Sequence, residues 1–484
     1  MSITVRFLLL SLLAAAPAAA QVPAAEYAAR RDSVAARIGD GLVLAFGARE
    51  PVDDMALYRQ LPSFHYLTGF HEPDAAFVMV ARNGRVQHAT VFLPPRDPRL
   101  ALYNGFLPDS ADVRREYGFG MRTMDYLRPV VDSLLALGLP LWHVPDIATR
   151  DVLQRDSLTR GTRFIEQLRA RVPRATVHNA QALLDSLRVR KSAGEIALLR
   201  KAIDITMQGF DSVLRVIEPG VSEAVVQAEA DRVFRTLGDG TAYGGIVGSG
   251  ANSTSYHYRA NNRVMQAGDV VVMDMGAIYQ GYTADITRTA PVSGTFTPEQ
   301  RRIYDIVLES QAAAERVARP GVRVAVGDSA IRAVHARRLA ELGLIESPDA
   351  TLDAPWNPNC TPNAVNCKQY FLFMAHGPGH GIGLEVHDAG GYSYSPTGIF
   401  QVGEVFTIEP GIYISTKLLD MLPDTPKNRA FIAKVRPAVE RYNNIGVRIE
   451  DDYVITADGV EWLSRAPRTA DEIEAAMRGV KASQ

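Results

Sequence analysis

The sequence predicts an α+β fold preceded by a smaller α/β domain. Over residues 176–484, helices with clear start signals alternate with candidate hairpins, a pattern typical of helices that cover a curved antiparallel sheet. Over residues 21–175, apolar strands mix with helical segments. A chain of 484 residues is long enough for both domains.

The first 20 residues carry the pattern of a secretory signal peptide. A single Arg6 precedes an apolar run that begins at Phe7, and the small residues Ala18–Ala20 precede Gln21. The apolar run is too short to span a membrane, so we expect cleavage and export to the periplasm or the extracellular space. An apolar helix kept in the mature protein is the alternative.

The rest of the chain gives no support for a membrane span or a nucleic-acid partner. After the leader, no stretch approaches the roughly 18 apolar residues that a spanning helix needs. The net charge of -2 provides no basic surface for nucleic acid or for an anionic membrane.

Four apolar stretches predict buried strands in the first domain: 41–46, 75–80, 89–93 and 140–144. The histidines among them, His65 and His71, are interpreted as structural, because no group of metal-ligating residues accompanies them. Residues 172–178 are interpreted as a linker to the second domain.

Capping signals place three helices in the second domain. Ser192 and Glu195 form a capping box, apolar residues then recur at helical spacing, and Pro219-Gly220 ends the pattern. Another helix begins at Ser222. A third begins at Thr297-Pro298, with proline at the first helical position.

The central stretch of this domain, residues 269–291, is predicted to form a hairpin, because runs rich in Val, Ile and Thr flank a Tyr-Gln-Gly turn. A two-residue loop of Tyr279 and Gln280 would place Asp274 directly opposite Asp285, with Cβ atoms about 5 Å apart. Like charges at that spacing repel, and a divalent cation between them would offset the repulsion. The sequence therefore predicts a cation site; two solvated carboxylates on an exposed hairpin are the alternative.

Further candidate ligands follow in three downstream motifs. His376-Gly-Pro-Gly-His380 spaces its histidines like a helical pair, but the glycines and proline between them predict a loop. Glu409 ends an apolar strand at a Pro-Gly turn. Arg448 and Glu450 share one face of a later strand. Each motif alone is weak evidence, whereas their combination favours a shared site.

In this order, five residues resemble the dinuclear site of the pita-bread metallopeptidases, which include methionine aminopeptidase, aminopeptidase P and prolidase: Asp274, Asp285, His380, Glu409 and Glu450. The surrounding motifs narrow the resemblance to the branch of aminopeptidase P and prolidase. They are 248–252 with His257-Tyr258, Asp285-Ile-Thr-Arg-Thr, His376-Gly-Pro-Gly-His380, Val386-His387-Asp388, Glu409-Pro-Gly and Arg448-Ile-Glu450-Asp451. Residues 58–73 favour aminopeptidase P, and the leader segment indicates a secreted form.

The resemblance implies a pita-bread catalytic domain over residues 176–484 and an aminopeptidase P-like N-terminal domain over 21–175. It implies that Asp285 and Glu450 bridge two metal ions, that Asp274 binds one, and that His380 and Glu409 bind the other. An oxygen-rich set favours Mn²⁺, with Co²⁺, Zn²⁺ or Fe²⁺ as alternatives.

By the same resemblance, Glu409 transfers a proton and His387 stabilises the oxyanion. His257 and His376 line the substrate pocket, and Arg448 contacts a ligand carboxylate or Tyr413. The expected enzyme releases the first residue from peptides with proline second, and we expect a homo-oligomer, either a dimer or a tetramer.

The alternative enzyme is a Xaa-Pro dipeptidase with the same metal site. It needs a cation for the free carboxylate of the substrate proline, for which Arg59 or an arginine within 415–444 is a candidate. A protein that keeps the fold without metals is disfavoured, since all five ligand positions are present.

The only two cysteines, Cys360 and Cys367, lie in a loop rich in Pro and Asn. In an exported protein this pair predicts a disulfide, with two free thiols as the alternative.

Overall fold

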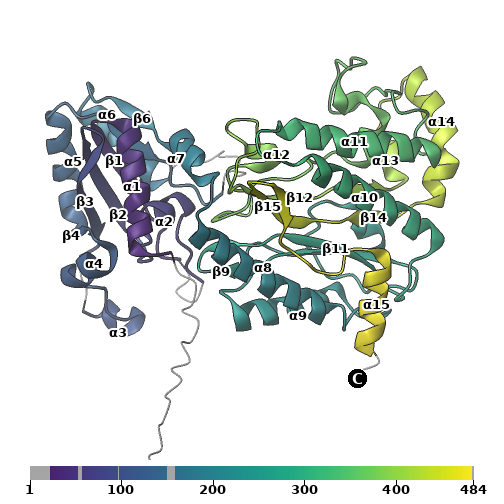
Figure 1. Cartoon of the computed structure of the whole chain (residues 1–484), viewed down its shortest axis with the longest axis horizontal. Coiled ribbons are helices and arrows are strands. Elements are labelled where there is room, and N and C mark those ends of the chain that lie inside the picture. The colour runs from purple at the N-terminus through teal and green to yellow at the C-terminus, as the bar shows by residue number, and fades with distance from the viewer. Residues whose placement is uncertain (1–21, 53–56, 96–97, 150–158, 482–484) are drawn as a thin grey trace, which may run out of the picture.

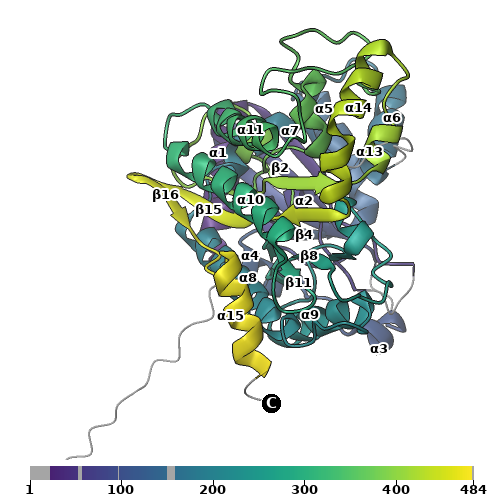
Figure 2. The same ribbon diagram turned by 90° about the vertical axis from the view of Figure 1, so that its right-hand side faces the viewer.

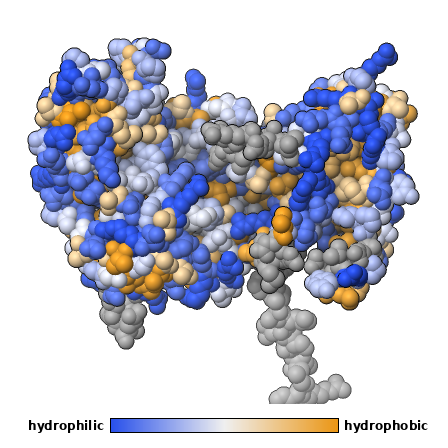
Figure 3. Space-filling model, turned by 180° about the vertical axis from the view of Figure 1, so that it is seen from behind, coloured by the Kyte–Doolittle hydropathy of each residue, from blue (hydrophilic) through white to orange (hydrophobic). Residues whose placement is uncertain are grey.

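The computed structural model describes residues 22–52, 57–95, 98–149 and 159–481, and the predicted signal segment lies outside this range. Two units stand side by side (Figure 1), with the N-terminal unit at the left and the larger unit at the right. From behind, a notch separates the two lobes, and most of the visible surface is hydrophilic (Figure 3). Among the described helices, none is long and apolar enough to cross a membrane.

The N-terminal unit is built on a six-stranded sheet with the order β4-β3-β2-β1-β5-β6. The β1–β2 and β2–β3 pairs are antiparallel, and the β3–β4, β1–β5 and β5–β6 pairs are parallel. The strands are β1 (Gly41–Phe46), β2 (Ala76–Arg82), β3 (Arg85–Leu93), β4 (Gly120–Thr123), β5 (Leu141–Val144) and β6 (Val177–Asn179). The helices are α1 (Ala24–Ile38), α2 (Pro62–Thr68), α3 (Leu100–Asn104), α4 (Ser110–Tyr117), α5 (Leu127–Ala136) and α6 (Arg160–Arg171).

The stretch expected to be a linker, 172–178, includes the start of β6, which pairs with β5. The first sheet therefore runs to Asn179, and the connection to the larger unit is α7 (Gln181–Arg188).

The larger unit consists of short, mostly antiparallel sheets covered by helices. Its sheets have the orders β11-β8-β7, β12-β15-β16, β13-β14 and β10-β9. The strands are β7 (Ile246–Ser249), β8 (Val270–Met275), β9 (Ile278–Tyr279), β10 (Tyr282–Thr283), β11 (Ile286–Pro291), β12 (Val405–Ile408), β13 (Gly411–Ile414), β14 (Ile445–Arg448), β15 (Asp451–Thr456) and β16 (Gly459–Trp462). The helices are α8 (Ala193–Val213), α9 (Glu223–Leu237), α10 (Pro298–Val317), α11 (Val324–Glu341), α12 (Gly391–Tyr394), α13 (Lys417–Asp420), α14 (Pro426–Arg441) and α15 (Ala470–Lys481).

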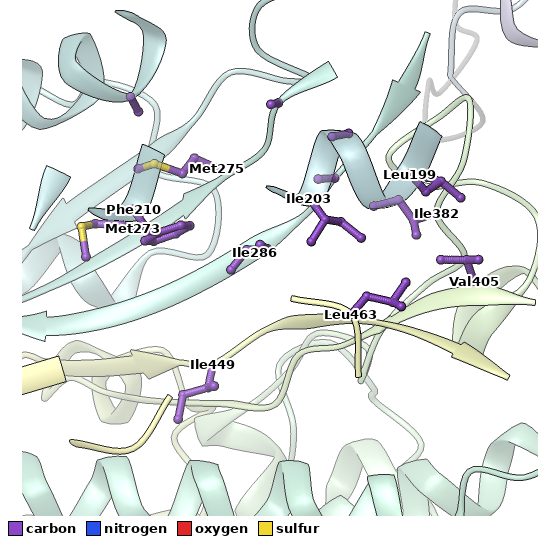
Figure 4. Packing of buried hydrophobic residues seen from close by; sticks show 14 of the residues in the cluster. Leu199, Ile203, Phe210, Met273, Met275, Ile286, Ile382, Val405, Ile449 and Leu463 are labelled. Atoms are coloured by element: carbon purple, nitrogen blue, oxygen red, sulfur yellow. The ribbon is translucent and has the colours of Figure 1, made fainter. Parts of the chain in front are cut away.

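Helices α8 and α9 lie on one side of these sheets, and α10 and α11 lie on the other (Figures 1 and 2). The predicted caps start three of these helices: Ser192 caps α8, Ser222 caps α9, and Thr297 caps α10 with Pro298 at its first position. The apolar face of α8 packs on the strands (Figure 4), where Ile203 and Phe210 lie near the β8–β11 layer. This packing fixes the strands that carry the predicted ligands.

Cys360 and Cys367 form a disulfide, as predicted. It closes a loop that ends at the buried Cys367, just before the 3₁₀ turn of residues 369–373.

Candidate metal centre

The hairpin that carries Asp274 and Asp285 has a different register from the predicted one. Gln280 and Gly281 form the turn, Tyr279 pairs with Tyr282, and Asp274 faces Thr287. The prediction that Asp274 lies directly opposite Asp285 was therefore wrong. The two carboxylates are diagonal neighbours on one face, a spacing that long side chains and ions still bridge.

The conformation of the turn explains the shift. Gln280 and Gly281 have φ values of 49° and 83°. Positive φ at both central residues matches the right-handed twist of the flanking strands, and glycine is well suited to the second position. The predicted loop would have required positive φ at Tyr279, which an aromatic residue rarely adopts.

Tyr243 joins the two carboxylates, and no sequence motif had indicated it. Its hydroxyl lies 2.5 Å from Oδ1 of Asp274 and 2.5 Å from Oδ1 of Asp285. Tyr243 follows α9 in the turn of residues 238–245, and the neighbouring Thr241 bridges to Ala277 of the hairpin. Only this pairing between distant segments places the hydroxyl at the site.

His380 approaches the carboxylates because glycines on both sides allow its backbone to lie close to β12. A Cβ atom at Gly379 would lie 2.1 Å from the carbonyl oxygen of Thr407, and one at Gly381 would lie 2.5 Å from that of Ala389. The amide of Thr407 donates to the carbonyl of His380 at 2.8 Å. The predicted loop between His376 and His380 is thus present, and its glycines are needed for close approach.

Three of the predicted ligands surround Nε2 of His380. This atom lies 3.5 Å from Asp285, 3.7 Å from Glu409 and 3.8 Å from Glu450. Donor atoms of Asp285, His380 and Glu450 all lie within 4.8 Å of one another. Nδ1 of His380 lies 3.1 Å from the carbonyl of Gly381, so a proton on Nδ1 leaves the Nε2 lone pair facing the carboxylates.

Burial gives these carboxyl groups unusual protonation properties. Burial, reinforced by neighbouring carboxylates, raises the pKa of Asp285 and Glu409 well above their ordinary values. Burial and the charge of Asp274 raise the pKa of Glu450 to about 8. Oε1 of Glu450 is buried and has no hydrogen-bond partner in the described structure. Without a counter-charge, several carboxylates in one buried pocket are costly, and divalent cations would supply that charge.

Asp274 differs from the other carboxylates because Arg448 lies beside it. Burial acts to raise its pKa, but the charge of Arg448 and the hydrogen bond from Tyr243 outweigh burial and lower it. Arg448 forms an ion pair with Asp274 through Nη2 and donates to the hydroxyl of Tyr413 at 2.9 Å through Nη1. Both predicted partners of Arg448 are therefore in contact with it.

His376, His257 and His387 surround a cavity of about 380 Å³ beside the carboxylates. Nε2 of His376 lies 2.9 Å from the hydroxyl of Tyr413, and burial lowers the pKa of His376 to about 3. Burial also lowers the pKa of His257. The ring of His387 lies 4.1 Å from that of His380. The structure thus brings His257, His376, His387 and Arg448 to one cavity, and Tyr413 contacts two of these lining residues, His376 and Arg448.

A second, larger cleft of about 1300 Å³ opens from the same carboxylates. One wall comes from residues 57–62 of the N-terminal unit and another from residues 384–387. His65 and His71 also line it; His65 is buried, with Nε2 3.2 Å from the hydroxyl of Tyr27. Arg59 donates to the backbone carbonyls of Thr241 and Ala242. The cleft therefore lies between the two units.

Comparison with known proteins identifies both units. Residues 197–457 match metallopeptidase family M24, and residues 27–138 match the aminopeptidase P N-terminal domain. A Xaa-Pro aminopeptidase from Escherichia coli is 32% identical over 464 residues, which cover 93% of this chain and 97% of that protein. A human Xaa-Pro dipeptidase is 29% identical over 477 residues, covering 93% and 91%.

Solved structures agree with these matches. Zinc-substituted aminopeptidase P from Escherichia coli, in complex with product, superposes with a TM-score of 0.78 at 28% identity and covers 95% of this chain and 99% of that one. This similarity confirms the predicted α+β pita-bread fold with a preceding N-terminal domain. The chain therefore belongs to metallopeptidase family M24, and an aminopeptidase P N-terminal domain precedes its catalytic domain.

Proposed function

We propose that this chain is a Xaa-Pro aminopeptidase, a two-metal exopeptidase that releases the first residue from peptides with proline second. The convergence of Asp285, His380 and Glu450 in one buried group carries this proposal. The group lies where the small cavity and the interdomain cleft meet, since Asp274 and Asp285 line both. Relatives of nearly full length bear the same activity in their names.

The donor set fits two divalent cations. Four carboxylates and one imidazole favour Mn²⁺, with Co²⁺, Zn²⁺ or Fe²⁺ as alternatives. Asp274, Asp285, His380, Glu409 and Glu450 would hold these ions. When bound, such ions polarise the peptide carbonyl and make water a nucleophile at neutral pH.

The protein's own groups move protons and hold the substrate. Glu409 lies 3.7 Å from Nε2 of His380 and lines the small cavity, so its carboxylate is placed to transfer a proton to the leaving prolyl nitrogen. His387, beside His380, is positioned to donate a hydrogen bond to the oxyanion. Arg448 keeps Asp274 and the Tyr413 hydroxyl in place through two contacts.

Aromatic rings in the small cavity account for the choice of proline. The ring of Tyr256 lies 4.5 Å from that of Tyr413 and 5.1 Å from that of His376. These faces can pack against a pyrrolidine ring, and a prolyl nitrogen carries no N–H that would need an acceptor. The pocket therefore suits proline as the residue after the scissile bond.

Arginine contacts support an aminopeptidase over the dipeptidase alternative. The guanidinium of Arg59 is occupied by two backbone carbonyls. In the 415–444 segment, Arg429, Arg436 and Arg441 pair with Asp424, Glu440 and Glu299, and none of these arginines lines either cavity. The candidate arginines for binding a dipeptide carboxylate thus already contact other groups of the protein. The large cleft leaves room for more residues after proline.

A paired assay tests this function. With Mn²⁺ added, we expect release of the first residue from Xaa-Pro-Xaa-Xaa and little cleavage when alanine replaces proline. Cleavage of Xaa-Pro alone would favour the dipeptidase. Cleavage of both longer peptides at similar rates would contradict proline selectivity.

We also propose export and self-association. The leader sequence supports a periplasmic or extracellular enzyme. In the N-terminal unit, Leu102, Tyr103 and Phe106 are 81%, 80% and 89% exposed, and clustered apolar exposure favours a homo-oligomer. Cell fractionation with N-terminal sequencing tests export. Sedimentation of the purified mature chain tests whether it is a dimer or a tetramer.

A further inference from the structure

The loop that carries His387 is shaped by backbone pairing on one side of the site. The amide of Asp388 donates to the carbonyl of Gly381 at 2.8 Å, and the amide of Thr283 donates to the carbonyl of Gly383 at 2.9 Å. These bonds fix residues 381–388 as a turn beside the metal-ligand hairpin. They do not by themselves fix the part between Glu385 and Asp388, where His387 lies.

Arg188 contacts both ends of that part. It is the last residue of α7, and its side chain is 1% exposed. Its Nη2 lies 2.8 Å from Oε1 of Glu385 and 2.8 Å from Oδ1 of Asp388. Glu385 and Asp388 enclose Val386 and His387, so one guanidinium holds the loop on both sides of the proposed oxyanion donor.

The same side chain reaches the N-terminal unit. Nη1 of Arg188 donates to the hydroxyl of Ser63 in α2 at 3.1 Å. Nζ of Lys191 lies 3.6 Å from the other carboxylate oxygen of Asp388, so two buried cations face two buried carboxylates. Gly383 is required here, because a Cβ atom would lie 2.1 Å from Oδ2 of Asp388.

A gain in folding stability does not by itself explain this buried cluster of two cations and two carboxylates. Buried ion pairs gain little net stability over well-packed apolar residues, because desolvation offsets their attraction. Their directional bonds do define geometry: Nη2 contacts Glu385 and Asp388 while Nη1 reaches Ser63, and a single lysine ammonium does not offer this planar set of separated donors.

We propose that Arg188 is a positioning residue for His387: by clamping Glu385 and Asp388 it sets the place of the imidazole over the reacting carbonyl. This inference rests on the proposed function, in which His387 stabilises the oxyanion. Arg188 itself touches neither substrate nor metal ligand. Its contact with Ser63 makes the junction of the two units part of the same support.

Arg188→Met tests this role, since methionine fills similar volume without the fork. We expect kcat to fall by about 10- to 100-fold, as is typical when a supporting hydrogen bond is lost, with KM and bound metal little changed. Arg188→Lys keeps the charge, should fold even if Arg188→Met does not, and should restore only part of kcat. Arg200→Met is the matched control. Arg200 lies on α8 and forms an exposed pair with Glu461 of β16, so this substitution should leave kcat unchanged.

A double-mutant cycle separates positioning from general damage. If Arg188 acts through His387, Arg188→Met should slow the His387→Ala enzyme by no more than about 2-fold. Multiplicative losses, a parallel loss of metal, or a fully active Arg188→Lys enzyme would overturn the positioning role. A His387→Ala enzyme with full kcat would overturn it as well. Wild-type enzyme that fails to cleave Xaa-Pro peptides would instead refute the proposed function.

Discussion

At the scale of single residues, the site depends on carboxyl groups whose charged form is destabilised by burial. Asp285 and Glu450 are 4% and 1% exposed, and both have raised pKa values. Few hydrogen bonds offset this cost in the described part of the chain: Thr287 donates to Glu450 at 2.8 Å, and the Tyr243 hydroxyl contacts Asp285. Their proximity to His380 makes cation binding the way to keep them ionised.

Asp285→Asn and Glu450→Gln should therefore abolish metal retention and peptide hydrolysis together, because each replaces a proposed ligand carboxylate with a neutral amide. Metal content by atomic spectrometry and turnover of a Xaa-Pro-Xaa-Xaa peptide measure the two effects. Asp420→Asn, in the short helix α13, is a distant control that should alter neither. Full activity in either site variant, or after verified metal removal, would contradict the two-metal proposal.

Tyr243 provides a second prediction at this scale. Tyr243→Phe removes the hydroxyl that contacts both Asp274 and Asp285 while keeping the ring. We expect metal affinity or kcat to fall by about 10- to 100-fold, because the two carboxylates lose their shared hydrogen-bond partner. Titration of the metal-free protein with Mn²⁺ and steady-state kinetics measure this. Unchanged values in both would show that the hydroxyl has no orienting role.

At the scale of elements, the sequence allowed three helices of the larger unit and several strands to be predicted, but not the register of the central hairpin. Capping boxes and helical spacing act within a few residues, so they located α8 and α10 correctly. The hairpin register depended on which two residues adopt positive φ. The predicted Tyr-Gln-Gly turn is present, but its central residues are Gln280 and Gly281 and not Tyr279 and Gln280, because glycine adopts positive φ without strain.

The ligand set could be named from motifs, whereas Tyr243 and Arg188 could not. Their partners are far along the chain: Tyr243 lies 42 residues from Asp285, and Arg188 lies 197 residues from Glu385. Neither residue stands in a local pattern that indicates a site. Only the packing of α7, and of the turn after α9, brings them close.

Gly281→Ala tests the observed turn. At φ 83° an alanine is strained by about 1–2 kcal/mol, so the free energy of unfolding should fall by roughly that amount. An added Cβ would meet its nearest neighbour at 3.5 Å, an ordinary contact, so steric crowding adds little. Urea unfolding measures the change. Gln280→Asn, which tolerates positive φ, should be neutral or slightly stabilising. Equal stability of Gly281→Ala and wild type would contradict the turn assignment.

The packing of α10 on α11 provides a pH-dependent prediction. His335 is 1% exposed, its Nε2 lies 3.2 Å from the hydroxyl of Ser310, and burial lowers its pKa to about 3. Because the unfolded chain binds this proton near pH 6.5, the neutral buried imidazole contributes stability above that pH. The contribution is lost as pH falls from about 6.5 toward 3, by at most about 1.4 kcal/mol per pH unit.

His335→Leu should remove that part of the slope, which unfolding measured at several pH values between 6.5 and 4 would show. The hydroxyl of Ser310 keeps backbone acceptors at Ile306 and Val307, so no buried donor is left without a partner. His88→Asn, on an exposed part of β3, is the matched control and should keep the wild-type slope. An unchanged slope in His335→Leu would show that His335 is not the responsible group.

At the scale of the whole molecule, buried charges join the N-terminal unit to the hairpin. Arg30 of α1 lies 3.2 Å from Glu195 at the start of α8. The hydroxyl of Tyr282, in the hairpin between the two aspartates, donates to the same carboxylate at 3.0 Å. With the bond between Arg188 and Ser63, these contacts hold the N-terminal unit against the larger unit near the interdomain cleft.

The long sequence separation between the segments of the site also determines when the site can form during maturation. Arg448 and Asp274 touch although 174 residues lie between them, and Thr287 meets Glu450 across 163 residues. A growing or threading polypeptide that still lacks its last strands has no complete set of donors, because long-range pairing forms only when both partners are present. If the leader directs export of the unfolded chain, the site would acquire its cations after translocation, from the ions of its destination.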